Sequence, residues 1–308
     1  MATIDQLRSR LESGWDEIDH GRSAKQDLWR SLLSLAATLG ADKADWRLLR
    51  APGRVNLIGE HTDYNGLPVM PAALDREVMM VFRPLPGGRV RVVNLEAAFG
   101  EREFQASAEI PPHSAGDWAN YVKAAAQALV LWARGRGLEA DCGFEAALTA
   151  DIPGGAGLSS SSALVVACGL AFANANALDI PRREMADLMA AGERYVGTQG
   201  GGMDQTACLM GEAHKAIRIE FNPTRVSPCP LPDGTAVIVA NTLVRAEKSA
   251  AMRENYNRRS AECRLASALV RKATGLDVKL LADLFGHEEA PMDILTRSVH
   301  SGGYTLQE

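Results

Sequence analysis

The sequence has no long apolar run and only five cysteines. No segment approaches the ~20 consecutive apolar residues that a membrane-spanning helix needs. Residues 1–22 alternate acidic and basic side chains, without the apolar segment of a secretory signal. The cysteines are scattered and form no CxxC pair, which argues against a disulfide framework and against a zinc site. We therefore expect a cytoplasmic protein whose cysteines are small core side chains.

An excess of basic charge is also missing. The formal net charge is −5, so neither nucleic acid nor an anionic membrane surface is an expected partner. With 308 residues, of which 46% are hydrophobic and 23% charged, the chain has the composition of a globular protein. It is long enough for two domains, and it contains no internal repeat or low-complexity tract.

Hydrophobic periodicity predicts a mixture of helices and strands. Apolar residues recur at helical spacing from Ile4 to Ile18 and from Leu28 to Leu39. Further helices are expected over 118–132, 163–173, 182–195 and 250–274, and strands over 78–82, 90–93, 144–149, 216–221 and 236–240. Residues 84–88 join the first two strands. This mixed order favours an α+β or mixed α/β architecture.

Pro52–Gly66 is the stretch with the densest polar chemistry. It reads PGRVNLIGEHTDYNG and packs Arg, Glu, His, Asp, Tyr and two Asn between glycines. A packed core has no use for so many polar groups, whereas sugar hydroxyls, which both donate and accept hydrogen bonds, match carboxylate, imidazole and amide groups. The stretch therefore indicates a pocket for a polyhydroxylated small molecule. The alternative is a solvated polar turn without a ligand.

Ile152–Ala163, with the sequence IPGGAGLSSSSA, is the second motif. Glycines allow the backbone to turn tightly and to point its N–H groups inward, and the start of the following helix adds unpaired N–H groups and a positive dipole end. Together these features favour a phosphate site. No Gly-Lys-Ser/Thr closes the loop, so it is not a Walker motif. A serine-capped helix start is the alternative, but four consecutive serines exceed what capping needs.

Gly200–Gln205, with the sequence GGGMDQ, is the third motif. Its glycines allow a ligand to approach the backbone near Asp204, although a glycine turn with a capping Asp is common. Glu193 lies upstream on a predicted helix, where it either reaches a metal or is simply exposed. Combined with the other motifs, Asp204 is placed to take a hydroxyl proton in phosphoryl transfer. Arg54 would keep Asp204 ionised and stabilise charge during transfer.

These motifs are similar to those of a known enzyme family. Gly53–Gly66 resembles the galactokinase signature, and Gly155–Ser161 resembles the ATP-binding loop of the GHMP small-molecule kinases. The similarity runs from about Ala51 to Ala266. It implies a GHMP kinase fold of two α/β domains with the active site in the cleft between them. We place the N-terminal domain at 1–212 and the C-terminal domain at 213–308.

The resemblance also implies residue roles. Asp204 would be the catalytic aspartate, with Arg54 beside the transferred phosphate. The sugar would contact Glu60, His61, Asp63, Gly201 and Tyr256. The nucleotide would contact Trp118 and Asn94 at the adenine, and Gly155, Ala156, Gly157, Leu158, Ser159, Ser160 and Ser161 at the phosphates. Ser161 and Glu193 would hold Mg²⁺. Without the resemblance, Trp118 and Tyr256 would be interpreted as core aromatics.

Two features concern the subgroup and the extent of the second domain. Residues 159–165, 193–205 and 239–244 resemble N-acetylgalactosamine kinases and fungal galactokinases, whereas His61–Gly66 has the plain galactokinase form. The family's third glycine-rich motif, Gly-Ala/Gly-Gly-Phe/Trp-Gly-Gly, is not found, and Gly302-Gly303-Tyr304 does not match it. We therefore expect an incomplete or divergent C-terminal domain that exposes apolar surface, in a monomer or weak homodimer.

Three hypotheses follow. The first is an enzyme that transfers the γ-phosphoryl group of ATP to the anomeric hydroxyl of galactose, with Mg²⁺. The second keeps the fold and changes the substrate to N-acetylgalactosamine or another small molecule. The third is a non-catalytic sensor that binds galactose and ATP. A panel of sugars in an assay of ADP release discriminates among them.

Overall fold

The computed structural model describes residues 2–14, 23–40, 45–240, 250–300 and 302. Its first elements are two helices, α1 (Ile4–Ser13) and α3 (Ser23–Thr38). Both predicted N-terminal helices are therefore present, although Trp15 and Ile18 lie outside the described residues. Thr3 caps α1 by accepting a hydrogen bond from the backbone N–H of Gln6, whose side chain bonds back to the backbone of Thr3.

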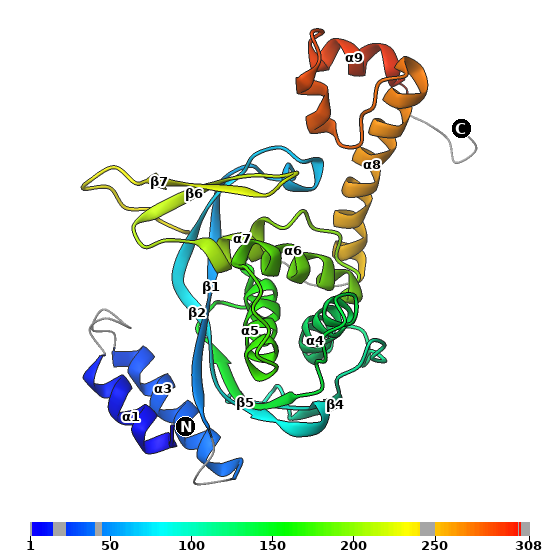
Figure 1. Cartoon of the computed structure of the whole chain (residues 1–308). Helices are drawn as coiled ribbons and strands as arrows, with labels where there is room; N and C mark the ends of the chain where they lie inside the picture. Colours follow the sequence, from blue (N-terminus) through cyan, green and yellow to red (C-terminus); the bar gives the residue numbers. More distant parts are fainter. Residues whose placement is uncertain (1, 15–22, 41–44, 241–249, 301, 303–308) are drawn as a thin grey trace.

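A five-stranded sheet forms the centre of the molecule (Figure 1). Its strands are β1 (Arg47–Ile58), β2 (Met70–Leu85), β3 (Arg89–Asn94), β4 (Arg102–Gln105) and β5 (Gly143–Ala150), in the order β1-β2-β5-β3-β4. The pairs are antiparallel except for β3 with β5, which run parallel. The strands predicted over 78–82 and 90–93 are present, but β5 lies between them, so they do not pair with each other.

Helices cover both faces of this sheet (Figure 1). Four lie on one face: α4 (Ala119–Arg134), α5 (Ser160–Ala175), α6 (Arg182–Gly192) and α7 (Met203–Met210). Strand β2 contributes side chains to the cores on both faces of the sheet, because successive side chains of a strand point to opposite faces. Met80 and Phe82 enter the large core beneath these four helices, whereas Met79 and Val81 pack against Trp29 of α3 on the other face.

The remaining elements follow the sheet in the sequence. The hairpin of β6 (Lys215–Glu220) and β7 (Arg225–Pro230) joins the main body through a bridge between Val69 and Ile219. The long helix α8 (Ala250–Thr274) leads to a 3-10 helix (Leu281–Gly286) and to α9 (Pro291–Ser298). These last elements share a small core of their own, which consists of Val270, Val278, Leu284 and Ile294.

Most predicted elements are confirmed, and one is wrong. Helix α8 has the predicted bounds, and α5, buried almost all round, contains the predicted apolar helix. No strand forms over 236–240, where Val237, Ile238 and Val239 are exposed. A strand needs a neighbour for its backbone hydrogen bonds, and these residues pair with none in the described part of the chain. The domain boundary at 212/213 stays a prediction.

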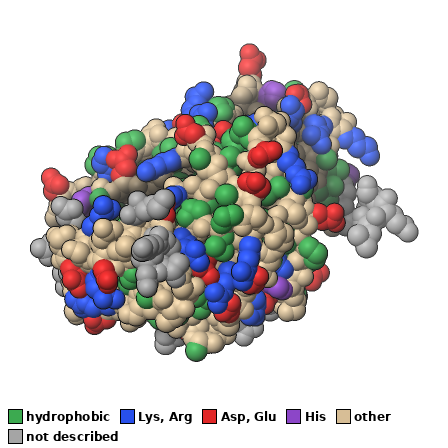
Figure 2. All heavy atoms as spheres, turned by 60° about the horizontal axis from the view of Figure 1, so that its bottom comes forward, with side chains coloured by type: hydrophobic (Ala, Val, Ile, Leu, Met, Phe, Trp, Pro, Cys, Tyr) green, Lys and Arg blue, Asp and Glu red, His purple; other side chains and the backbone are tan. Residues whose placement is uncertain are grey.

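Among the described residues, no helix combines the length and the apolar character needed to cross a membrane. Acidic and basic side chains are mixed over the face seen in Figure 2. This mixture fits the small net charge of −5.

Candidate active site

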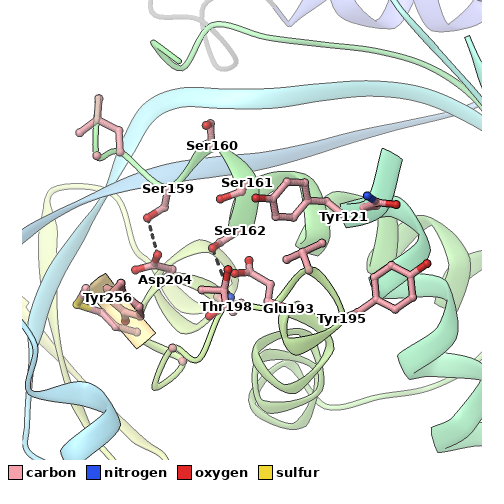
Figure 3. A pocket seen from close by; sticks show the side chains of 18 of the residues that line it. Tyr121, Ser159, Ser160, Ser161, Ser162, Glu193, Tyr195, Thr198, Asp204 and Tyr256 are labelled. Atoms are coloured by element: carbon pink, nitrogen blue, oxygen red, sulfur yellow. Dashed lines mark hydrogen bonds between the residues drawn. The ribbon is translucent and has the colours of Figure 1, made fainter. Parts of the chain in front are cut away.

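Residues from all three sequence motifs line one cavity of about 640 Å³. Figure 3 shows part of this cavity, with the serines of the second motif and Asp204 of the third. Those that the sequence singles out are Arg54, Glu60, His61, Asp63, Gly155, Gly157, Leu158, Ser159, Ser160, Ser161, Glu193, Asp204 and Tyr256. They come from β1 and the loop after it, from the turn before α5 and the first residues of α5, from the segment before α7 and the first turn of α7, and from α8. Stretches up to about two hundred residues apart in the sequence therefore meet at one place.

The first motif divides into a strand and a loop. Its first half belongs to β1, where Arg54 pairs with Ala73 of β2, and only the residues after Ile58 form a loop with a short 3-10 helix (Asp63–Asn65). Strand β1 passes close to the turn that precedes α5, which is the glycine- and serine-rich second motif and is called the serine-rich turn below. A Cβ on Gly53 would lie 2.7 Å from the carbonyl oxygen of Leu158 in this turn. The backbone N–H of Arg54 donates to that same oxygen at 3.2 Å. Glycine at position 53 allows this close approach.

Asp204 is held on both of its carboxylate oxygens. Arg54 donates to Oδ1 from Nε at 2.7 Å and lies 2.6 Å from it through Nη2, and the Ser159 hydroxyl donates to Oδ2 at 2.7 Å. Arg54 also donates through Nη1 to the carbonyl oxygen of Gly157 at 2.8 Å. The side chains of Arg54 and Asp204 are 13% and 28% exposed, so the ion pair is largely shielded yet open to the cavity. The carboxylate, which α7 carries, is therefore held by a side chain of β1 and by a side chain of the turn before α5.

Asp63 and Gly201 join the first and third motifs at one end of the cavity. The backbone N–H of Gly201 donates to Asp63 Oδ2 at 3.0 Å. A Cβ on Gly201 would lie 2.3 Å from the carbonyl carbon of Asp63, so no larger residue fits without a shift of the backbone. Burial, and secondarily the charge of Asp204, raise the pKa of Asp63 above its ordinary value. The folded protein therefore keeps this carboxyl in a place that disfavours its charge.

Three aromatic rings lie together beside Asp63. His61, Tyr64 and Tyr256 have ring centroids 5.4–5.9 Å apart. Tyr256 comes from α8, and the next residue, Asn257, fixes that helix to the segment before Gly200: its side chain donates to the carbonyl oxygen of Gly197 and accepts from the backbone N–H of Gln199. Helix α8 thereby supplies one wall of this end of the cavity.

The serine-rich turn and Glu193 occupy another part of the cavity (Figure 3). Helix α5 begins at Ser160, so the unpaired N–H groups of its first turn lie at the serine run. Ser159, just before it, adopts a left-handed backbone conformation with φ of 58°. The Glu193 side chain is nine-tenths buried and faces the cavity near Ser161 and Ser162 (Figure 3). The N–H and hydroxyl groups of this region can donate hydrogen bonds to phosphate oxygens, and the Glu193 carboxylate can bind a cation that accompanies the phosphates.

The donor set fits Mg²⁺ rather than a metal held by protein alone. Among the described residues, no group of three or more His, Cys, Asp or Glu side chains could bind a metal. Mg²⁺ commonly takes one or two protein oxygens and fills its other positions with water and substrate phosphates. The hydroxyl of Ser161 and the carboxylate of Glu193 are ligands of that kind.

Four residues named from the resemblance do not line the cavity: Asn94, Trp118, Ala156 and Gly201. Trp118 packs edge-on against Phe99 at 6.4 Å and against the large core. Asn94 accepts a hydrogen bond from the backbone N–H of Glu96. Gly201 instead contacts Asp63 through its backbone. The adenine roles of Trp118 and Asn94 stay predictions.

Several residues that line the cavity carry no role predicted from the sequence, among them His113, Asn120, Tyr121, Tyr195 and Thr198. Tyr195 donates its hydroxyl to the carbonyl oxygen of Ile110, which ties the loop before α4 to the segment after α6. Tyr121 follows Trp118 by one helical turn, and that spacing is the one signal that could have suggested it. The loop that carries His113 has no motif of its own.

Two family models and several curated proteins match parts of this chain. Residues 36–84 match the galactokinase galactose-binding signature, and residues 120–212 match the GHMP kinase N-terminal domain. Galactokinase from Dictyostelium discoideum is 36% identical over 74% of this chain and 46% of its own length. Galactokinase from Chloroflexus aggregans is 38% identical over 76% of this chain and 57% of its own. The chain thus spans about half the length of these curated relatives.

A solved structure extends the similarity to the fold. The crystal structure of Lactococcus lactis galactokinase complexed with galactose superposes with a TM-score of 0.66 at 30% identity. The match covers 86% of this chain and 68% of that one. The matched part is therefore most of this chain.

Proposed function

Because the chain belongs to the galactokinase family of GHMP kinases, we propose that it transfers the γ-phosphoryl group of ATP to the anomeric hydroxyl of galactose. One observation carries the proposal: Arg54 of β1 and Ser159 of the turn before α5 hold Asp204 in the same cavity that Glu60, His61 and Asp63 line. A polar loop, an anion-binding helix start and a fixed carboxylate in one cavity are the parts that phosphoryl transfer to a sugar requires.

The reaction would proceed at Asp204. The hydroxyl oxygen on sugar C1 attacks the γ-phosphorus, its proton passes to a carboxylate oxygen of Asp204, and the bond to the β–γ bridging oxygen breaks to release ADP. Each carboxylate oxygen accepts more than one hydrogen bond, so Asp204 retains capacity for the sugar hydroxyl while Arg54 and Ser159 hold it. Arg54 also places positive charge where negative charge develops.

The remaining roles follow from position in the cavity. Glu60, His61 and Asp63 would bind sugar hydroxyls, and the first turn of α5 with its serines would bind the phosphates. Mg²⁺ held at Ser161 and Glu193 would neutralise phosphate charge. Five free cysteines suit a reducing compartment, so the cytoplasm is part of this proposal.

An assay of ADP release with a panel of sugars tests the proposal. The panel contains galactose, N-acetylgalactosamine, glucose and no sugar, each with ATP and Mg²⁺. We expect ADP release that depends on galactose, with glucose much poorer because a lost buried hydrogen bond costs about 1–3 kcal/mol. Preference for N-acetylgalactosamine would change the substrate. Calorimetric binding of galactose and ATP without ADP release would instead support a sensor.

A further inference from the structure

His61 and Tyr64 form a hydrogen-bonded pair within one turn. His61 Nδ1 lies 2.7 Å from the Tyr64 hydroxyl. The backbone of His61 is left-handed, with φ of 60°, and its carbonyl oxygen accepts a hydrogen bond from the Asn65 side chain at 2.9 Å. A non-glycine residue in this conformation persists where its surroundings impose it, often at a functional site. The turn therefore holds the imidazole in a defined place beside the cavity.

The direction of this hydrogen bond follows from the available partners. Burial raises the pKa of Tyr64 to about 12, so its hydroxyl keeps its proton at neutral pH. In the described part of the chain, His61 Nδ1 is the one hydrogen-bond partner of that hydroxyl. If Nδ1 carried a hydrogen, the phenolic hydrogen would have no protein acceptor. If Tyr64 donates instead, both groups are satisfied.

We propose that Tyr64 is a positioning residue of the sugar site. Its hydroxyl donates to Nδ1 of His61 and places the imidazole hydrogen on Nε2, so that His61 presents a hydrogen-bond donor to a sugar oxygen. The hydrogen bond made by one ring nitrogen sets the role of the other. The sugar part of this statement rests on the proposed function. The tautomer part does not, because it concerns two side chains of the free protein.

Tyr256 separates the role of the hydroxyl from that of the aromatic packing. Its ring lies 5.4 Å from His61 and 5.9 Å from Tyr64, and it contacts both from α8. The hydrogen bond to His61 Nδ1, however, comes from Tyr64. Replacement of either tyrosine by phenylalanine keeps all three rings. The two variants therefore form a matched pair that differs in the hydroxyl removed.

The first test is the tautomer of His61 in the full chain without ligands. Nitrogen-15 NMR distinguishes Nδ1–H from Nε2–H, and loss of signals in His61→Gln assigns the resonances of this residue among the six histidines. We expect the Nε2–H form in the wild type, a mixture of the two forms in Tyr64→Phe, and an unchanged tautomer in Tyr256→Phe. An unchanged tautomer in Tyr64→Phe, or an equal change in both variants, would overturn the proposal.

The second test is galactose binding, measured by calorimetry without ATP and by steady-state kinetics. We expect Tyr64→Phe to weaken galactose binding about 5-fold, which corresponds to one ordinary hydrogen bond. The KM for galactose should rise more than kcat falls, and the KM for ATP should not change. A general loss of structure would alter all three and lower Tm. A shifted tautomer in a protein that turns over no sugar would contradict the proposed function while supporting the role of Tyr64.

Discussion

At the residue scale, the proposed chemistry depends on one carboxylate, that of Asp204, which Arg54 and Ser159 hold in place. Replacement of Asp204 by Asn removes the proton acceptor while keeping size and most hydrogen bonds. We expect turnover to fall by roughly 10²–10⁴-fold, the usual contribution of a positioned general base. The ADP-release assay measures the loss, and circular dichroism checks that the fold and Tm are retained. Near-normal turnover in this variant would remove Asp204 from the proposed role.

Asp63 is a second residue whose environment gives a prediction, because the folded protein raises the pKa of its carboxyl. A carboxyl whose pKa is raised on folding binds protons more readily in the folded state, so its unfavourable contribution to stability grows as pH rises past the unfolded pKa near 3.8. We therefore expect Asp63→Asn to raise Tm at pH 7 but not at pH 3, while weakening galactose binding. Thermal melts across this pH range measure the difference. A lower Tm at pH 7 would contradict the prediction.

Gly201 shows how a backbone contact can shape the end of the cavity that we propose binds the sugar. An alanine at this position would place its Cβ 2.3 Å from the backbone of Asp63, so one of the two segments must move. We expect Gly201→Ala to raise the KM for galactose at least about 10-fold, since displacement of binding groups by 1 Å can cost 10²-fold. Gly286→Ala is the matched control, because a Cβ on Gly286 would meet no atom within 4 Å and Gly286 does not line the cavity. If both variants had the same KM for galactose, the contact between Gly201 and Asp63 would not contribute to galactose binding.

At the scale of elements, helix α3 is fixed to the sheet by a buried ion pair as well as by Trp29. Lys25 is 4% exposed, lies 2.9 Å from Glu77 of β2, and donates to the carbonyl oxygen of Asp75. Removal of one partner leaves a buried charge with less compensation, which typically costs about 3–5 kcal/mol. We expect Lys25→Ala to destabilise the protein toward the lower end of that range, because Arg50 still pairs with Glu77.

Chemical denaturation measures the effect of Lys25→Ala on the free energy of unfolding. Arg8→Ala is the control, since Arg8 forms an exposed pair with Asp5 within α1. Exposed pairs contribute about 0–1 kcal/mol, so this variant should unfold almost as the wild type does. If both variants unfold alike, the buried pair does not anchor α3.

A helix or strand can be predicted from the sequence when its own side chains determine its conformation. The periodicity over 250–274 predicts a helix, and α8 has those bounds. The apolar run over 236–240 predicts a strand that the structure lacks, because strand formation depends on a partner elsewhere in the chain. For the same reason Pro52–Ile58, whose composition suggests a loop, is strand: its ladder with β2 decides the conformation. Strand β7 is not predicted, because its two prolines interrupt the alternation of apolar and polar residues that indicates a strand.

The residues of the candidate site also fall into those that the sequence predicts and those that it does not. Glycine and serine motifs can be recognised because close backbone approach and helix starts demand those residue types, as at Gly53 and Gly201. His113 and Tyr195 reach the cavity through a loop and a 3-10 turn whose sequences carry no such demand. Their presence depends on how α4 and α6 pack, which short-range patterns do not record.

At the scale of the whole molecule, the described surface includes one uninterrupted apolar segment. Val237, Ile238 and Val239 are exposed, with Ile238 at 89%, and the run Ala236–Ala240 carries no charge. Such a segment has high strand propensity and, within the described part of the chain, no partner strand for its backbone groups; this is the combination that favours pairing between chains. The net charge of −5 opposes association only weakly for a chain of 308 residues.

We therefore expect this chain to self-associate weakly through residues 236–240. Light scattering coupled to gel filtration should show an average mass that rises with protein concentration, and Ile238→Lys should hold the protein at the monomer mass. Met292→Lys is the control, because Met292 is also exposed but lies on helix α9 outside this segment. A wild-type mass of one chain at every concentration, or equal suppression by both substitutions, would contradict association through this segment.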